Sequence, residues 1–208
     1  EALFTRRCVC CGRSFSGRQC VCSECAAGLV PADEPRGDFA ACASYLYEGA
    51  ARDVMLRFKF GEAPELYADT LADWLCDGFD RHYDGESFDF AVSVPSFGER
   101  PRMELFVRDF AARRGLCYRP ELLIKTRPTE KQHRLSAAER RTNLRGAFAA
   151  SEAVRGKSIL LVDDIFTTGS TVCECTAALL AAGAKSVSVL TVLRTEDKTE
   201  KSDNRKEK

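Results

Sequence analysis

The sequence predicts an α/β protein with a parallel sheet, preceded by a small cysteine-rich module. Strand-like and helical segments alternate between residues 89 and 193, as in parallel sheets whose strands are connected by helices. The segment Ser158–Asp163 (SILLVD) is almost continuously apolar, which is typical of a strand buried on both faces. Six of the 11 cysteines lie within residues 8–25, apart from this pattern. Two structural units are therefore expected.

The composition excludes a strongly charged or membrane-spanning protein. The 208 residues suffice for one domain and a small appendage, and 31 basic residues balance 31 acidic ones. A chain without net charge has no global field that draws it to nucleic acid or membrane. No apolar run approaches the roughly 20 residues that span a bilayer, so we expect no membrane span. Cysteines clustered at one end of a longer chain favour metal binding and a cytoplasmic location over a secreted disulfide scaffold.

The first 27 residues are expected to form a cysteine-rich zinc module. Two Cys-x-x-Cys pairs, Cys8 with Cys11 and Cys22 with Cys25, each bring two thiolates close enough for one tetrahedral ion. Gly12 permits a tight turn after the first pair. So small a segment cannot build a core, and we predict that structural Zn²⁺ supplies its folding energy.

The remaining cysteines leave alternatives open. Cys10 or Cys20 could replace a neighbouring ligand, and an iron–sulfur cluster or a redox pair would use the same residue type. The scattered cysteines are expected to be small buried side chains or inert thiols; they are Cys42, Cys76, Cys117, Cys173 and Cys175.

Residues 28–37 contain two prolines and a glycine and are predicted to be a linker, so that the main domain covers residues 38–195. The first half of this domain should contain two strands and three helices. A helical face of Tyr67, Leu71, Trp74, Leu75 and Phe79 is expected to pack in the core. The expected elements are a strand at Cys42–Gly49, a short helix at Arg52–Glu62, a helix at Pro64–Tyr83, a strand at Asp89–Pro95, and a helix at Arg102–Arg113 with Leu105, Phe106, Phe110 and Ala111 facing inward.

The second half should contain three strands and a long helix. Capping-box patterns at Ser136–Glu139 and Thr171–Glu174 each predict a helix start, the second helix ending at Gly183. The charged segment 196–208 is expected to be disordered. The remaining expected elements are strands at Glu121–Lys125, Ser158–Asp163 and Ser186–Leu193, and a polar loop at Arg127–Leu135.

The stretch ILLVDDIFTTGST, residues 159–171, places two carboxylates before a run of small residues that opens a helix. Backbone N–H groups of such a loop, together with the helix dipole, bind phosphate. No lysine follows Gly169, so this is not a Walker A loop. Asp163 and Asp164 would repel that phosphate, and they suit sugar hydroxyls or a divalent cation instead. A phosphorylated sugar satisfies both ends of the motif.

Two other interpretations compete with this one. The acids could merely cap a turn at an ordinary strand end. They could also form the acidic pocket of a receiver-type domain, but too few residues follow for the further strands that such a domain needs.

VDDIFTTGST resembles the phosphoribosyl diphosphate (PRPP) signature of type I phosphoribosyltransferases over its whole length. The resemblance implies the Rossmann-like fold of that family. It also implies that Asp163 and Asp164 hold the ribose hydroxyls and act as the catalytic acids, and that Mg²⁺ arrives with PRPP. The 5′-phosphate would lie on Thr167, Thr168, Gly169, Ser170 and Thr171.

The chain also resembles the ComF family over nearly its whole length to residue 194. The similar motifs are CVCCG, CSEC, YEG, RFKFGE, the pair Val94 and Pro95, and QHRLSAAERRTNLRGAF at Gln132–Phe148. The resemblance implies a phosphoribosyltransferase-like protein with an N-terminal four-cysteine zinc module, linked to DNA uptake in natural competence. Gln132, Arg140 and Asn143 become candidates for a loop over the diphosphate of PRPP.

One departure from the family leaves the function open between two classes. Ser96–Leu105 lacks the Arg-Gly-Phe-Asn-Gln stretch usual after Val-Pro, and only Arg100 and Arg102 carry positive charge there. The protein is thus either a transferase of phosphoribose or a non-catalytic PRPP- or nucleotide-sensing module. Such a module would bind DNA-uptake proteins, or single-stranded DNA through Phe15 and the nearby arginines Arg6, Arg7, Arg13 and Arg18. No general base is identifiable, and neither His82, expected at the surface, nor His133 is predicted to be catalytic.

Overall fold

The computed structural model describes residues 5–37, 39–95, 102–128 and 144–196. Several predictions fall outside these residues. They concern the loop at 96–101, the helix start at Ser136–Glu139, the candidate ligand residues Gln132, Arg140 and Asn143, His133, and the charged tail from residue 197.

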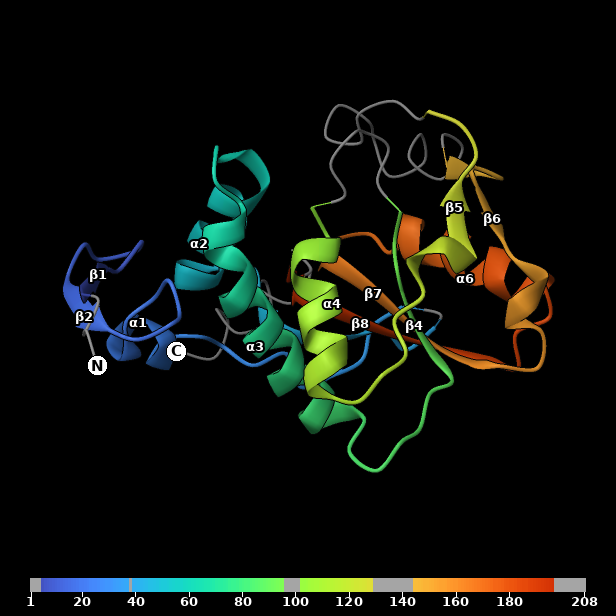
Figure 1. The fold of residues 1–208 in the computed structure, drawn as a ribbon, viewed down its shortest axis with the longest axis horizontal. Helices are drawn as coiled ribbons and strands as arrows, with labels where there is room; N and C mark the ends of the chain where they lie inside the picture. Colours follow the sequence, from blue (N-terminus) through green and yellow to red (C-terminus); the bar gives the residue numbers. More distant parts are fainter. Residues whose placement is uncertain (1–4, 38, 96–101, 129–143, 197–208) are drawn as a thin grey trace, which may run out of the picture.

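A four-stranded parallel sheet forms the centre of the protein, in the order β3–β8–β7–β4. Its strands are β3 (Cys42–Leu46), β8 (Ser186–Arg194), β7 (Ser158–Phe166) and β4 (Phe90–Ser93). Figure 1 labels the strands β4, β7 and β8 of this sheet. Tyr118 forms one parallel bridge with Ala91 beyond β4. The predicted α/β class with a parallel sheet is confirmed.

Alternate residues of β7 face two separate apolar cores, as a strand buried on both faces requires. Leu160 and Val162 pack with α2 (Gly49–Phe60), α3 (Glu65–His82) and α4 (Glu104–Arg113). Ile159 and Leu161 pack on the other face with α6 (Ser170–Ala181). Figure 1 shows α2, α3 and α4 grouped away from α6.

The predicted helices on the first face are present, with one wrong orientation. The apolar face of α3 is in the core, since Leu71, Trp74, Leu75 and Phe79 are buried. In α4, Phe106, Phe110 and Ala111 are buried as predicted, but Leu105 is 43% exposed. Val107 takes an inward position instead, because one turn of a helix can bury only part of its circumference.

The predicted strand at Glu121–Lys125 is not part of the parallel sheet. Only β5 (Leu123–Lys125) is extended, after a 3₁₀ turn η1 at Pro120–Leu122. It pairs antiparallel with β6 (Phe148–Ala150), a three-residue strand that was not predicted. A second 3₁₀ turn, η3 (Glu152–Val154), leads into β7. The predicted alternation of strands and helices is therefore correct for the central sheet but not for this separate two-stranded sheet.

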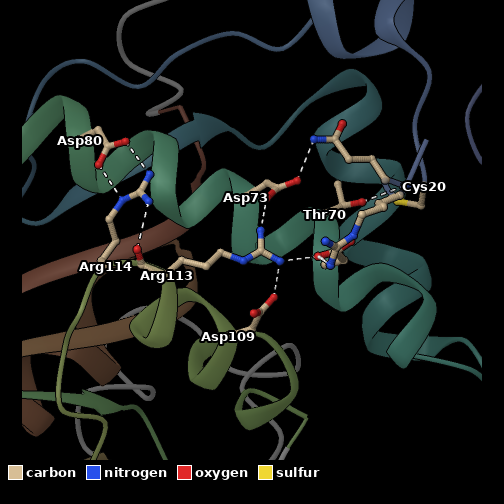
Figure 2. A network of polar contacts seen from close by, with 10 residues as sticks. Cys20, Thr70, Asp73, Asp80, Asp109, Arg113 and Arg114 are labelled. Carbon is tan, nitrogen blue, oxygen red and sulfur yellow. Dashed lines mark hydrogen bonds and ion pairs between the residues drawn. The ribbon is translucent and has the colours of Figure 1, made fainter. Parts of the chain in front are cut away.

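The cysteine-rich segment forms β1 (Thr5–Arg7), β2 (Ser14–Ser16) and α1 (Ser23–Ala27). It packs against α2 and α3 through the buried side chains of Cys8, Cys20, Val21 and Cys22. The Cys20 N–H donates to Thr70 Oγ1 at 2.8 Å. Arg18 donates a hydrogen bond to Asp69 of α3, and Gln19 donates one to Asp73. Arg113 of α4 forms ion pairs with both of these aspartates (Figure 2). A polar network thus continues the apolar contact from the segment across two helices.

His82 and the scattered cysteines have structural surroundings. His82 is half-buried rather than at the surface as predicted, and its Nε2 lies 3.1 Å from the carbonyl oxygens of Ala32 and Ala43. It thereby fixes residues 28–37 to β3. Of the five scattered cysteines, Cys42, Cys76 and Cys175 are buried, Cys173 is half-buried and Cys117 is exposed.

Candidate functional site

A pocket of about 490 Å³ opens where β4 and β7 end and α6 begins. This is the edge of an open parallel sheet at which ligands bind, beyond the carboxyl ends of the strands. All seven motif residues predicted from the sequence line it: Asp163, Asp164, Thr167, Thr168, Gly169, Ser170 and Thr171. The other lining residues are Lys59, Val94, Pro95, Met103, Lys125, Phe148, Ile165, Phe166 and Val172.

Asp163 and Asp164 lie within β7, not at its end as predicted. The strand continues to Phe166, because Ile165 and Phe166 still pair with Leu193 and Arg194 of β8. Consecutive residues of a strand point to opposite faces, so the two acids approach the pocket differently. The Asp164 N–H donates to Asp163 Oδ1 at 2.9 Å.

The two acids differ in their electrostatic surroundings. Burial and the charge of Asp164 raise the pKa of Asp163 to about 7, although the Asp164 N–H and Lys59 oppose this rise. Asp164 instead has a direct counter-ion. Lys59 Nζ lies 2.9 Å from its Oδ1 and 2.8 Å from its Oδ2. Asp163 and Asp164, together with Lys59, therefore carry less negative charge than two free carboxylates would.

Lys59 was not predicted as a site residue. It lies in the last turn of α2, 105 residues before its partner, within the motif RFKFGE that resembles the ComF family. Arg102 fixes this end of α2, because its Nη1 donates to the carbonyl oxygens of Phe58 at 2.6 Å and Lys59 at 2.8 Å. Carbonyl groups of the last turn lack partners within a helix, and a cation there stabilises it.

The loop between β7 and α6 provides the N–H groups of a helix start. Gly169 precedes α6 with φ of 73°, a conformation that favours glycine. A Cβ at this position would lie 2.8 Å from Cζ of Phe166. The hydroxyls of Thr168 and Ser170 are 2.9 Å apart and hydrogen-bonded. The first N–H groups of α6 have no acceptor within the helix, so they can serve an anion.

The predicted capping box at Thr171–Glu174 is wrong. The helix begins at Ser170, and Gly169 as its N-cap offers no side-chain oxygen. Glu174 Oε2 instead accepts a hydrogen bond from the Gly146 N–H at 3.1 Å. The N-terminus of α6 is thus left without a side-chain cap, as a ligand site requires.

The opposite wall of the pocket carries a second lysine. Lys125, in β5, lies 5.8 Å from the centre of the Phe148 ring. Burial, with a smaller contribution from the charge of Arg127, lowers the pKa of Lys125. Two lysines from opposite faces of the sheet thus border the acid pair.

The thiol groups of Cys8, Cys11, Cys22 and Cys25 form a separate cluster, in which all four sulfur atoms lie within 4.8 Å of one another. Gly12 has φ of 72°, and its N–H donates to the Cys8 carbonyl at 2.9 Å. The Ala26 N–H donates to the Cys22 carbonyl at the same distance, so both Cys-x-x-Cys pairs enclose a tight turn.

These four residues fit a tetrahedral metal ion. Cys11 Sγ lies 3.7 Å from Cys22 Sγ, and a zinc–sulfur bond of about 2.3 Å implies a sulfur–sulfur distance of roughly 3.8 Å. Burial opposes ionisation of Cys8, but backbone N–H groups of Cys11, Cys22 and Cys10 outweigh it, and the pKa of Cys8 falls to about 6. Cys10 and Cys20 do not join the cluster. Cys10 contacts the Ala50 carbonyl of α2, and burial raises its pKa to about 12.

In the comparison with protein families, residues 124–207 match the phosphoribosyl transferase domain. This stretch contains β7, the loop with its two acids, and α6. This part of the chain is similar to a phosphoribosyl transferase domain. Together with the four-cysteine cluster and the relatives described next, this confirms the resemblance to the ComF family and the type I fold.

Its curated relatives include proteins called DNA utilization protein YhgH. That of Escherichia coli O157:H7 is 47% identical over 75 residues, which cover 36% of this chain and 33% of the relative. That of Salmonella typhi is 36% identical over 113 residues, which cover 51% of this chain and 50% of the relative. The chain therefore spans a third to a half of the length of the curated relatives it matches.

Some solved structures are also similar to part of this chain. One is glutamine PRPP amidotransferase from B. subtilis complexed with ADP and GMP, with 22% identity, a TM-score of 0.45 and coverage of 65% of this chain and 30% of that chain. Another is adenine phosphoribosyltransferase from Leishmania tarentolae, with 18% identity and a TM-score of 0.39. The match covers 66% of this chain and 74% of that chain. Within the described ranges, none of the helices combines the length and the apolar character needed to cross a bilayer.

Proposed function

We propose that this protein binds PRPP in the pocket formed by β7 and α6. The ribose 2′ and 3′ hydroxyls donate to Asp163 and Asp164, and the 5′-phosphate accepts hydrogen bonds from the loop Thr167–Thr171. One observation carries the proposal: a single pocket joins adjacent carboxylates to an uncapped helix N-terminus. Carboxylates accept hydroxyl donors, and the helix start favours an anion, so the two ends of a phosphorylated ribose are complementary to the two ends of the pocket.

The chemistry that follows is transfer of phosphoribose. Diphosphate leaves the anomeric carbon while a nucleophile approaches, and positive charge develops on the ribose ring. Asp163 and Asp164 hold the ring by its hydroxyls and place negative charge beside it. Mg²⁺ would arrive on the diphosphate and ribose oxygens, where it would neutralise the charge of the leaving group. The oxygen-rich acid pair fits such a metal–ligand complex.

The four-cysteine cluster is proposed to hold structural Zn²⁺. Tetrahedral thiolate sites without an open position are structural sites. The spacing of Cys11 and Cys22 supports this metal, and packing of the cysteines against α2 and α3 would transmit its stabilisation to the rest of the fold.

A second candidate function is PRPP or nucleotide sensing without turnover. The observation that favours it is the position of Arg102, the described arginine of the atypical loop, which binds carbonyl groups at the end of α2 rather than the pocket. In either case we propose a cytoplasmic role linked to DNA uptake; in its support, the curated relatives are named DNA utilization proteins.

Single-stranded DNA is the less favoured partner of the cysteine-rich segment. Three of its four arginines are already engaged: Arg6 with the Arg18 carbonyl, Arg13 with Glu24, and Arg18 with Asp69. Phe15, the predicted stacking residue, is half-buried and packs against the core. We therefore propose a DNA-uptake protein as the partner of this surface.

The test is calorimetric titration of PRPP with Mg²⁺ into the metal-loaded protein, beside an assay for diphosphate release. We expect saturable binding that Asp163→Asn/Asp164→Asn abolishes. The matched control is Asp84→Asn/Glu86→Gln, which removes the same charge in the exposed turn before β4. Binding with diphosphate release supports the transferase, and binding without it, across nucleobase and amine acceptors, supports the sensor. A wild-type protein that does not bind PRPP would refute the transferase and the PRPP sensor, and would leave only a nucleotide sensor.

A further inference from the structure

A second pocket, of about 530 Å³, adjoins the loop that connects β7 to α6. The acid pair lines the first pocket but not this one. The second cavity is within the size range of about 300–1,000 Å³ that small-molecule sites occupy. The loop therefore borders two cavities, and the residues common to both are Phe166, Thr168, Gly169, Ser170 and Val172.

Two turns that are far apart in the sequence contribute an arginine each to the lining of the second pocket. One turn begins at Arg36, whose backbone forms two hydrogen bonds with the backbone of Ala41, at 2.7 and 2.8 Å. The other turn contains Arg145 and Gly146, and the Gly146 N–H donates to Glu174 of α6 at 3.1 Å. Both turns are thus held in place by hydrogen bonds beside the pocket.

The polar groups that line this pocket favour an anion. The hydroxyls of Thr168 and Ser170 are hydrogen-bonded to one another. Glu174, the carboxylate among the described lining residues, already accepts a hydrogen bond from a backbone N–H. The guanidinium groups of Arg36 and Arg145 only donate hydrogen bonds, and their planar fork matches the geometry of a phosphate group.

The pocket also offers aromatic surface. Phe39 and Phe166 line it and are both half-buried, so a planar base can stack on either ring. A Cβ at Gly37 would lie 3.2 Å from Cζ of Phe166, and a Cβ at Gly169 would lie 2.8 Å from the same atom. The Phe166 ring therefore packs against both the Arg36 turn and the loop before α6.

We infer that the second pocket binds a nucleotide, with its phosphate group on Arg36 and Arg145 and its base on Phe39 and Phe166. The ligand class follows from the two kinds of group that the pocket combines, which are forked cations and aromatic rings. The site excludes the acid pair, so the inference does not depend on PRPP binding in the first pocket. A nucleotide held there contacts the loop proposed to bind the 5′-phosphate, and any coupling between the two sites must be reciprocal.

The experiment is calorimetric titration of AMP into the full metal-loaded chain. Because the acid pair could also bind the ribose of AMP, the titration is made on Asp163→Asn/Asp164→Asn, which should retain AMP binding. Adding Arg145→Gln should weaken binding by about 10- to 100-fold, because a charge-assisted hydrogen bond is lost. Adding Phe39→Ala should weaken it by about fivefold or more, because a stacking contact with the base is lost.

The matched control is Arg52→Gln, which should leave AMP binding unchanged. Arg52 is an exposed arginine of α2 that lines neither pocket. Adenosine and inorganic phosphate each satisfy only one part of the pocket, so each should bind at least about tenfold more weakly than AMP. Thermal melting of every variant shows that the comparison is made on folded protein.

Four results would overturn the inference. AMP binding that Asp163→Asn/Asp164→Asn abolishes would place the nucleotide in the first pocket, and AMP binding that survives both Arg145→Gln and Phe39→Ala would place it elsewhere. Inorganic phosphate that binds as tightly as AMP would show an anion site without a base. A wild-type protein that does not bind AMP would show no nucleotide site. Titration of PRPP into the wild type tests the proposed function separately, so either proposal can fail alone.

Discussion

The backbone N–H of Cys20 donates to Thr70 Oγ1, and this contact fixes the cysteine-rich segment to α3 (Figure 2). Both residues are almost fully buried, with 5% of Cys20 and none of Thr70 exposed. Thr70→Val keeps the shape of the side chain but leaves the N–H without an acceptor. Such a group costs about 1–3 kcal/mol, so we expect this decrease in the free energy of unfolding. Denaturant unfolding of the metal-loaded protein measures it.

The control for this prediction is Thr70→Ser, which keeps the hydroxyl and should recover most of the lost stability. A Thr70→Val protein as stable as the wild type would show that water or a shifted backbone replaces the hydroxyl, and that the segment is held by its apolar contacts alone.

Removal of one cysteine should abolish metal binding by the whole cluster. We expect Cys11→Ser to purify with less than about a tenth of the zinc of the wild type, because a three-thiolate site binds the ion far more weakly. Elemental analysis gives the stoichiometry. Cys117→Ser, which alters another exposed cysteine, should retain one ion per chain. Full zinc content in Cys11→Ser would indicate that another cysteine replaces it.

The raised pKa of Asp163 predicts how stability depends on pH. The folded protein binds the proton of Asp163 more tightly than the unfolded chain does. Protonated Asp163 therefore contributes fully to the free energy of unfolding below about pH 4, and this contribution is lost as pH rises toward 7. Asparagine does not ionise, so the Asp163→Asn variant should not lose this contribution. Its free energy of unfolding relative to that of the wild type should rise by about 1–4 kcal/mol between pH 4 and pH 8.

The measurement is denaturant unfolding of both proteins across this pH range. Groups that do not interact with Asp163 cancel in the difference, whereas Asp164 and Cys175 interact with it. A constant difference between wild type and Asp163→Asn would contradict the assignment of the raised pKa to Asp163.

Gly169→Ala should weaken phosphate binding more than it weakens the fold. The new methyl group would meet the Phe166 ring at 2.8 Å, and the residue would have to adopt φ of 73°. Strain of this kind costs about 1–3 kcal/mol. The loop can relieve it by moving, which displaces the N–H groups of α6. We expect a PRPP dissociation constant at least about tenfold higher, while Tm falls by only a few degrees.

The comparison for Gly169 is Gly85→Ala, which also has a positive φ, at 78°, but lies far from the pocket and meets no atom within 4 Å. It should lower Tm without changing PRPP binding. If Gly169→Ala binds PRPP as the wild type does, the loop is not the phosphate site.

Features that were predictable from the sequence are local ones. The acids and Thr167–Thr171 are consecutive, and a strand followed by a helix brings them to one pocket whatever else the chain does. Both Cys-x-x-Cys pairs are equally local. The antiparallel pairing of β5 with β6 was missed, because three-residue strands carry too short a pattern to separate them from loops.

The unpredicted site residues depend on contacts between distant segments. Lys59 meets a partner 105 residues away, and Arg102 reaches back 43 residues to the carbonyl group of Lys59. Nothing in the local pattern of α2 distinguishes Lys59 from Arg57, since both are basic residues of its last turn. The RFKFGE motif marked the segment as a family feature, but only the fold indicates which of its charges faces the pocket.

The helix α2 contacts the cysteine-rich segment at one end and the acid pair at the other. Its first turn receives the Cys10 thiol at the Ala50 carbonyl, and its last turn carries Lys59 to Asp164. Twelve residues of helix, about 18 Å, therefore separate the surroundings of the metal cluster from the acid pair. If loss of the metal displaces α2, Lys59 moves with it, and a purified sample with incomplete metal content would be a mixture of two populations with unlike ligand affinities. Titration curves from such a sample would look like weak or heterogeneous binding, so metal content must be measured before any affinity is compared.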